Sequence, residues 1–136
     1  MDYQELAKEL FHIMRKSRRP PMDEPMKYSR GEMGMLHYLH FTKDGVTSGE
    51  LSESFSISTG RVASALKSLE KKGLIVRRTD SSDKRKVLVF ITDSGKEVVV
   101  EAHHHAIAMT EKMLRRLTEE DAKEFVRLIK IIFTNK

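Results

Sequence analysis

The sequence predicts a mainly α-helical fold with one small β-hairpin. Apolar residues recur every three or four positions over most of the 136 residues, which indicates amphipathic helices. Two runs rich in β-branched residues, 74–79 and 86–92, flank a polar turn, as in a hairpin. The length favours a single domain spanning 1–136.

The composition excludes several classes of protein. No run approaches the roughly 18 apolar residues of a membrane span, and the acidic, amphipathic N-terminus is unlike a signal peptide. Cysteine is absent, which excludes disulfides and thiolate catalysis. We therefore expect a cytoplasmic protein with no membrane partner.

Residues 2 to about 18 are expected to form an amphipathic helix, ended by prolines at 20, 21 and 25. Its apolar face consists of Tyr3, Leu6, Leu10, Ile13 and Met14. A second helix runs to about Phe41. It begins at the capping box "SRGE", in which Ser29 caps a backbone N–H and Glu32 reaches back.

A short helix follows the break at "DG", residues 44–45. It begins at a second capping box, "TSGE" (47–50), and it directs Leu51 and Phe55 inward. The tight turn "SIS" then connects it to a longer helix.

This longer helix, from about Ser58 to Lys72, is closed by Gly73, the usual residue of a left-handed C-terminal cap. Val62, Leu66 and Leu69 share one side and are expected to pack on the short helix. The opposite side is polar, basic and small enough to enter a DNA major groove. The candidate DNA-contacting residues on it are Ser58, Thr59, Gly60, Arg61, Ser64, Lys67, Ser68 and Lys71.

The hairpin is followed by two helices. A long helix runs from about Asp93 to Arg116, and the last helix begins after Thr118, a good N-cap followed by acidic residues. The apolar residues that the last helix is expected to bury are Phe125, Leu128, Ile129, Ile132 and Phe133.

Helix, tight turn, helix and hairpin is the order of a winged helix-turn-helix, and the charge distribution agrees with a DNA-binding role. Residues 58–86 hold nine Lys or Arg against three acidic residues, a net charge of +6, whereas the rest sums to −1. Such an excess indicates a surface for a polyanion, here double-stranded DNA, although a solvated face without a partner is the alternative. We expect Arg61 to read guanine and Ser64 and Ser68 to contact bases or phosphates. The lysines of the same face are expected to contact phosphates.

The terminal helices carry apolar stripes that a compact DNA-binding lobe cannot cover, which predicts a homodimer. A two-fold dimer would place two such helices roughly 34 Å apart, one turn of DNA, and would read a palindrome. An ordinary pair of helices within one chain is the alternative.

The stretch "SISTGRVASALKSLEKKGLIVRRTDSSDKRKVLVFITDSGKE", 56–97, resembles the MarR (multiple antibiotic resistance regulator) family of bacterial transcription factors. The matching elements are Val62, Leu66, "LEKKGLI", Arg77, the "DSSDKR" turn and "ITDSGKE". The chain departs from many relatives at Gly60 and Ala63, which are smaller, and in the proline-rich linker.

The resemblance implies a homodimeric transcriptional regulator, interpreted as a repressor that a small apolar or aromatic ligand releases from its operator. It implies that 1–28 and 93–136 form a helical dimerisation region around a DNA-binding lobe, 29–92. In the wing, Arg85 would enter a minor groove and Asp83 would orient it. The other residues of the wing that are candidates for DNA contact are Arg77, Lys84 and Lys86. The residues expected to line a ligand pocket are His12, Met33, His37 and Met109.

The sequence also suggests two alternative functions. The run "HHH" at 103–105 suggests a zinc-responsive regulator, but neighbouring helical residues point about 100° apart, so no metal is assigned. A winged-helix protein-interaction module is the second alternative. The sequence has no phosphate-binding glycine loop and no convincing nucleophile with its base, so neither an enzyme nor a cofactor is expected.

Overall fold

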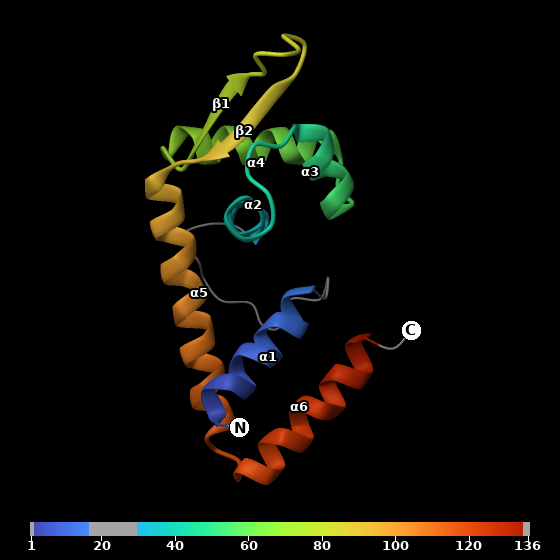
Figure 1. Ribbon diagram of the computed structural model, residues 1–136, viewed down its shortest axis with the longest axis vertical. Coiled ribbons are helices and arrows are strands. Elements are labelled where there is room, and N and C mark those ends of the chain that lie inside the picture. Colours follow the sequence, from blue (N-terminus) through green and yellow to red (C-terminus); the bar gives the residue numbers. More distant parts are fainter. Residues whose placement is uncertain (1, 17–29, 135–136) are drawn as a thin grey trace. The chain divides into compact units, whose positions relative to one another are not determined.

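The computed structural model describes residues 2–16 and 30–134, and Figure 1 shows how the elements follow one another. The elements are α1 (Tyr3–Lys16), α2 (Arg30–Phe41), α3 (Ser48–Phe55), α4 (Thr59–Lys71), β1 (Ile75–Thr79), β2 (Val87–Ile91), α5 (Asp93–Leu114) and α6 (Glu119–Thr134). The mainly helical winged helix-turn-helix that the sequence predicts is confirmed. Within the described residues, no helix is both long and apolar enough to cross a membrane.

The chain divides into two compact units. The winged unit contains α2, α3, α4, both strands and α5 as far as Val100, and the helical unit contains α1, α5 from Glu101 onward and α6. From the family resemblance, the helical region is expected to begin earlier, at residue 93. The first turns of α5 belong to the winged unit because Val99 is buried in its core.

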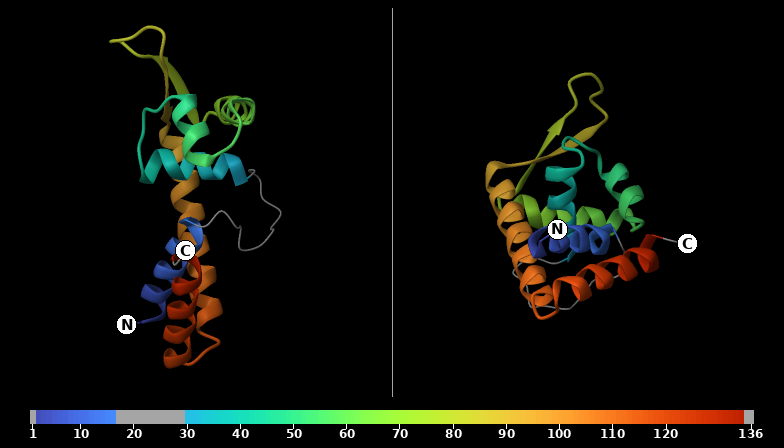
Figure 2. Two further views of the ribbon diagram at one scale, coloured as in Figure 1. Left: turned by 90° about the vertical axis from the view of Figure 1, so that its right-hand side faces the viewer. Right: turned by 60° about the horizontal axis from the view of Figure 1, so that its bottom comes forward.

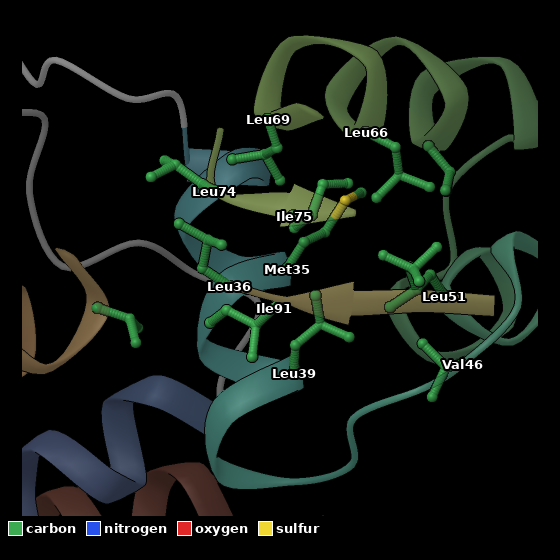
Figure 3. Close-up of a cluster of buried hydrophobic side chains, with 13 residues drawn as sticks. Met35, Leu36, Leu39, Val46, Leu51, Leu66, Leu69, Leu74, Ile75 and Ile91 are labelled. Atoms are coloured by element: carbon green, nitrogen blue, oxygen red, sulfur yellow. The ribbon is translucent and has the colours of Figure 1, made fainter. Parts of the chain in front are cut away.

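Apolar side chains from all elements of the winged unit meet in one core. In Figure 3, Met35 and Leu39 of α2 gather with Leu66 of α4 and with Ile75 and Ile91 of the hairpin. The residues predicted to face inward do so: Leu51, Val62, Leu66 and Leu69 are fully buried, and Phe55 packs against the core. Burial of this one face of α4 leaves its opposite face to solvent.

The hairpin forms an antiparallel pair in which Ile75 lies opposite Ile91 and Thr79 opposite Val87. It projects beyond the helices of its own unit, as both views of Figure 2 show. The segment before α3 adds a bridge that the sequence analysis does not predict. Val46 pairs with Val89 through N–H···O bonds of 3.2 Å and 2.7 Å, so β2 has a neighbour on each side near its middle.

Side-chain caps fix where several helices begin, as predicted. Gly73, with a φ of +76°, provides the left-handed residue that ends α4. The capping oxygens belong to Thr47, Ser58 and Thr118, which accept the backbone N–H groups of Glu50, Arg61 and Asp121 at 3.1, 3.2 and 3.1 Å.

In the second capping box, the expected return contact from Glu50 to the backbone of Thr47 is wrong. The Glu50 carboxylate accepts a hydrogen bond from Lys43 Nζ at 3.3 Å and makes no bond to the backbone at the start of its own helix. In the first capping box, Ser29 lies outside the described residues, and Glu32 has partners on α4 that are described below.

In the helical unit, α1 packs on α6, and small residues at the contact allow a close approach. Ala7 of α1 and Ala122 of α6 have no exposed surface. The predicted apolar face of α1 is confirmed, because Leu6 and Leu10 are buried in the core of this unit and Ile13 is also buried.

The prediction for α6 needs correction, because its apolar residues occupy two adjacent faces. Ala122, Val126 and Ile129 contact the core of the helical unit. Three of the residues expected to be buried are centred on the neighbouring face of the helix, since each residue advances the helix by about 100°. These are Phe125, Leu128 and Ile132, which are 38%, 45% and 65% exposed within the single chain.

Candidate nucleic-acid interface

The outer face of α4 is polar and exposed. The cap at Ser58 starts the helix, and the buried residues opposite determine which side chains face solvent. On a helix that begins with a capped N-terminus, the positive end of the helix dipole adds to the charge of the basic side chains. The exposed candidates are Ser58, Thr59, Gly60, Arg61, Ser64, Lys67 and Lys71.

Ser68 differs from the other candidates because its hydroxyl already has a partner. It is half-buried, and its Oγ donates to Glu32 Oε2 of α2 at 2.8 Å. The same oxygen accepts Nζ of Lys72 at 2.9 Å. Glu32 itself is only 7% exposed. Sequence analysis missed this contact, since the local pattern around Glu32 predicts a capping role.

A groove of about 370 Å³ lies between the first half of α2 and the side of α4 that carries Arg61 and Ser64. Glu32 and Met35 line it from α2, and Arg61 and Ser64 line it from α4. On this side, α4 therefore borders a groove next to its contact with α2.

The turn of the wing holds Arg85 through its aspartate. Asp83 Oδ1 accepts the backbone N–H of Arg85 at 3.0 Å and its Nε at 3.2 Å, while the Arg85 side chain remains 91% exposed. These hydrogen bonds lower the pKa of Asp83 from its usual value. Asp80 has a different partner: hydrogen bonds from the backbone and the hydroxyl of Ser82 lower its pKa.

The remaining wing candidates differ in exposure. Lys84 and Lys86 are exposed. Arg77 is half-buried, with its Nε 3.6 Å from Glu70 Oε1 of α4, so part of its charge is balanced within the chain. Arg78, the next residue on β1, is exposed and adds a cation that was not among the predicted wing residues. Alternation along a strand could have indicated this residue, because Arg77 and Arg78 must face opposite sides.

The residues expected to line a ligand pocket are divided between the two units. Met33 and His37 lie half-buried on α2, and the His37 ring packs against Phe41 with 4.5 Å between centroids. His12 is exposed on α1, and Met109 is 49% exposed on α5.

The three consecutive histidines point in different directions, as helical geometry requires. His103 is half-buried and meets the Phe11 ring edge-on at 5.1 Å, whereas His104 and His105 are exposed. In the part of the chain that the structure describes, no group of three or more His, Asp or Glu side chains is placed to hold a metal.

A short helix, a tight turn, a helix with an exposed basic face and a hairpin define the class of winged helix-turn-helix proteins. Residues 27–86 match the model of the MarR family. The transcriptional regulator HosA of Escherichia coli O157:H7 is 30% identical over 88 residues, which make up 65% of this chain and 65% of HosA. The chain thus spans just under two thirds of the length of this curated relative.

Solved structures have the same fold over nearly the whole chain. YusO of Bacillus subtilis has a TM-score of 0.74 and 20% identity, over 98% of this chain and 88% of its own. A MepR mutant of Staphylococcus aureus bound to an oligodeoxyribonucleotide has a TM-score of 0.63 and 21% identity, over 97% of this chain and 91% of its own. The match of residues 27–86 to the family model and the similarity to HosA together support the MarR family.

Proposed function

We propose that this protein is a sequence-specific DNA-binding transcriptional regulator that acts as a homodimer on a pseudo-palindromic operator. The observation that carries the proposal is the exposed basic face of α4 beside a wing whose arginine is already held in place. The name of HosA, a transcriptional regulator, and the oligonucleotide bound to the MepR mutant support it.

In this proposal α4 enters the major groove, where base pairs present distinct patterns of donors and acceptors. Arg61 reads guanine from the first turn of the helix, and Ser64 contacts a base or a phosphate. Lys67 and Lys71 neutralise phosphates on either side of the groove, and the N-terminus of the helix, at 58–60, favours a phosphate through its free N–H groups.

The wing adds a second contact. Arg85 inserts into a minor groove, and its planar guanidinium suits the narrow, negative groove of A·T-rich sequence. Asp83 orients it, while Lys84 and Lys86 interact with the backbone. The hydrogen bonds between Asp83 and Arg85 support this role, because they fix the first part of an otherwise mobile side chain.

The exposed apolar face of α6 supports the homodimer. Phe125, Leu128, Ile131 and Ile132 are each more than one third exposed in the single chain. Side chains of this size favour burial against a second copy, and a two-fold axis would pair the face with itself.

The regulatory part of the proposal comes from the family resemblance. We assign the protein a repressing role in the cytoplasm, relieved by a small apolar or aromatic ligand, and no enzymatic role. His12, Met33, His37 and Met109 remain the candidates for ligand contact.

Selection of bound duplexes from a random DNA library tests the proposal. We expect an enriched pseudo-palindrome, bound by a dimer, with an affinity whose log–log salt slope changes by roughly −0.9 for each neutralised phosphate. Arg61→Ala should weaken binding and relax the preference at one position of each half-site. Lys112→Ala, which removes an exposed cation from α5, is the matched control and should leave both unchanged. No enriched sequence, or an affinity that is insensitive to salt, would refute the proposal.

A further inference from the structure

Glu32 has no part in the proposed contacts with DNA, yet among the described residues it is the one charged side chain that is buried. We infer that Glu32 is a positioning residue that sets the orientation of α4, and with it the sequence specificity of DNA binding. This inference rests on the proposed function, and it concerns how the recognition helix is held.

The contacts of Glu32 join two helices that are far apart in sequence. One carboxylate oxygen accepts Ser68 Oγ at 2.8 Å and Lys72 Nζ at 2.9 Å, from residues 36 and 40 positions further along the chain. Ser68 lies in the last turns of α4, and Lys72 is its C-cap residue. The carboxylate therefore fixes the C-terminal end of α4 against the first turn of α2.

The other contacts of α4 restrain its rotation less, since its ion pair with β1, from Glu70 Oε1 to Arg77 Nε, is longer, at 3.6 Å, and partly exposed. Val62, Leu66 and Leu69 are fully buried, but apolar packing is not directional. On the side of Arg61 and Ser64, α4 borders a groove of about 370 Å³. The hydrogen bonds of Glu32 are directional and oppose such a rotation.

A purely stabilising role does not explain a buried charge well. Desolvation of the Glu32 carboxylate offsets much of its attraction to Lys72, whose side chain is 35% exposed, and apolar side chains of similar volume often stabilise a protein as much or more. What a buried carboxylate with directional hydrogen bonds provides in addition is one defined arrangement of the helices it joins. For a recognition helix, this arrangement decides which bases Arg61 and Ser64 can reach, because a small rotation moves both side chains along the groove.

The test compares affinities for the selected operator and for a scrambled duplex of equal length and composition, at one salt concentration. Glu32→Gln removes the charge and preserves the shape. We expect the ratio of the two affinities to fall about tenfold, the discrimination that one good base contact provides. Binding to the scrambled duplex and its salt dependence should not change, because the exposed cations remain.

Two control variants separate orientation from stability. Glu50→Gln breaks an exposed ion pair with Lys43 and should leave the ratio unchanged. Leu39→Val destabilises the same core without touching the contacts of Glu32, so it should lower the melting temperature and preserve the ratio. Glu32→Asp retains the charge but is too short for both partners, and it should lower the ratio even if Glu32→Gln does not fold.

The outcomes are distinguishable. A parent protein that does not prefer the operator would refute the proposed function, and this inference with it. A parent that does, together with an unchanged ratio in the Glu32 variants, would overturn the inference alone. An equal loss of the ratio in Leu39→Val would also overturn it, since general destabilisation would then be the cause.

Discussion

Replacing Asp83 by alanine sets two physical effects against each other. The variant loses a negative charge next to the DNA, so electrostatics alone predicts tighter binding. It also loses the acceptor that holds Arg85 through the backbone N–H at 3.0 Å and through Nε at 3.2 Å. Because these bonds lower the pKa of Asp83, its carboxylate is ionised at neutral pH, and both effects are fully present there.

The size of the second effect follows from the freedom of the Arg85 side chain. This side chain is 91% exposed, so Asp83 is its main restraint before DNA arrives. Ordering an arginine costs about 1.5–2 kcal/mol of rotamer entropy, equivalent to about tenfold to thirtyfold in binding. Asp83 restrains only the part of the side chain up to Nε, so we expect Asp83→Ala to weaken operator binding by a few-fold, within this limit.

Fluorescence anisotropy with the selected operator, at moderate salt, measures this change. Asp80→Ala is the matched control, because it removes the same charge from the same turn, but its carboxylate is bonded to Ser82 and to no arginine. We expect Asp80→Ala to bind as tightly as the parent or more tightly. Arg85→Ala should weaken binding strongly, most of all on sites with A·T-rich flanks, and Arg85→Lys should recover only part of the loss.

The orienting role would be refuted if Asp83→Ala bound the operator more tightly than the parent, with folding unchanged by circular dichroism. Equal effects of Asp83→Ala and Asp80→Ala would lead to the same conclusion. The two aspartates would then be ordinary residues of a charged turn.

Three further predictions concern other parts of the chain. In Gly95→Ala, the new Cβ would lie 2.3 Å from the Leu74 carbonyl oxygen, so urea denaturation should show a loss of about 1–3 kcal/mol; unchanged stability would contradict the packing described for the start of α5. Leu128→Glu combined with Ile132→Glu should give a monomer by sedimentation and abolish tight operator binding, whereas a monomer that still binds tightly would show that the dimer is unnecessary. Changing the histidines at 103–105 together to glutamine should leave operator affinity and its response to zinc or chelator as in the parent, and a parent whose chelator sensitivity disappears in this variant would favour a metal sensor.

The sequence predicts the order of elements well because the signals that start and stop them are local. Ser58 and Thr118 cap helices through backbone groups three residues away, and Gly73 ends α4 through its own backbone conformation. The β-branched composition of the two runs is equally local, and the polar turn between them indicates that they pair with each other. Such features are readable from a few neighbouring residues.

The contacts that sequence reasoning missed join distant residues. Asp44 lies in a segment interpreted only as a break, yet its Oδ1 accepts the backbone N–H of Ile91 at 3.0 Å, 47 residues away. The contact of Glu32 with α4 could not be predicted for the same reason, because the residues around Glu32 are compatible both with a capping role and with a contact to a distant helix. In α6, apolar residues lie on two faces of the helix. Their spacing alone does not predict which of these faces packs against Ala7 and its neighbours on α1.

The two proposed surfaces can be tested independently because they lie on different units. A monomer with an intact α4 and wing should bind a single half-site as the parent does, since none of its DNA-facing residues has changed. On the full palindrome the parent gains from its second half-site, whose effective concentration raises the overall affinity by about 10²–10⁴. The α6 double variant should therefore lose affinity of this order on the palindrome and almost none on the half-site. Variants of Arg61 or Glu32 should change the preference among sequences on both kinds of site. If the α6 variant lost half-site binding as well, α6 would contribute to the fold of the DNA-binding unit, and the separation of assembly from recognition would be wrong.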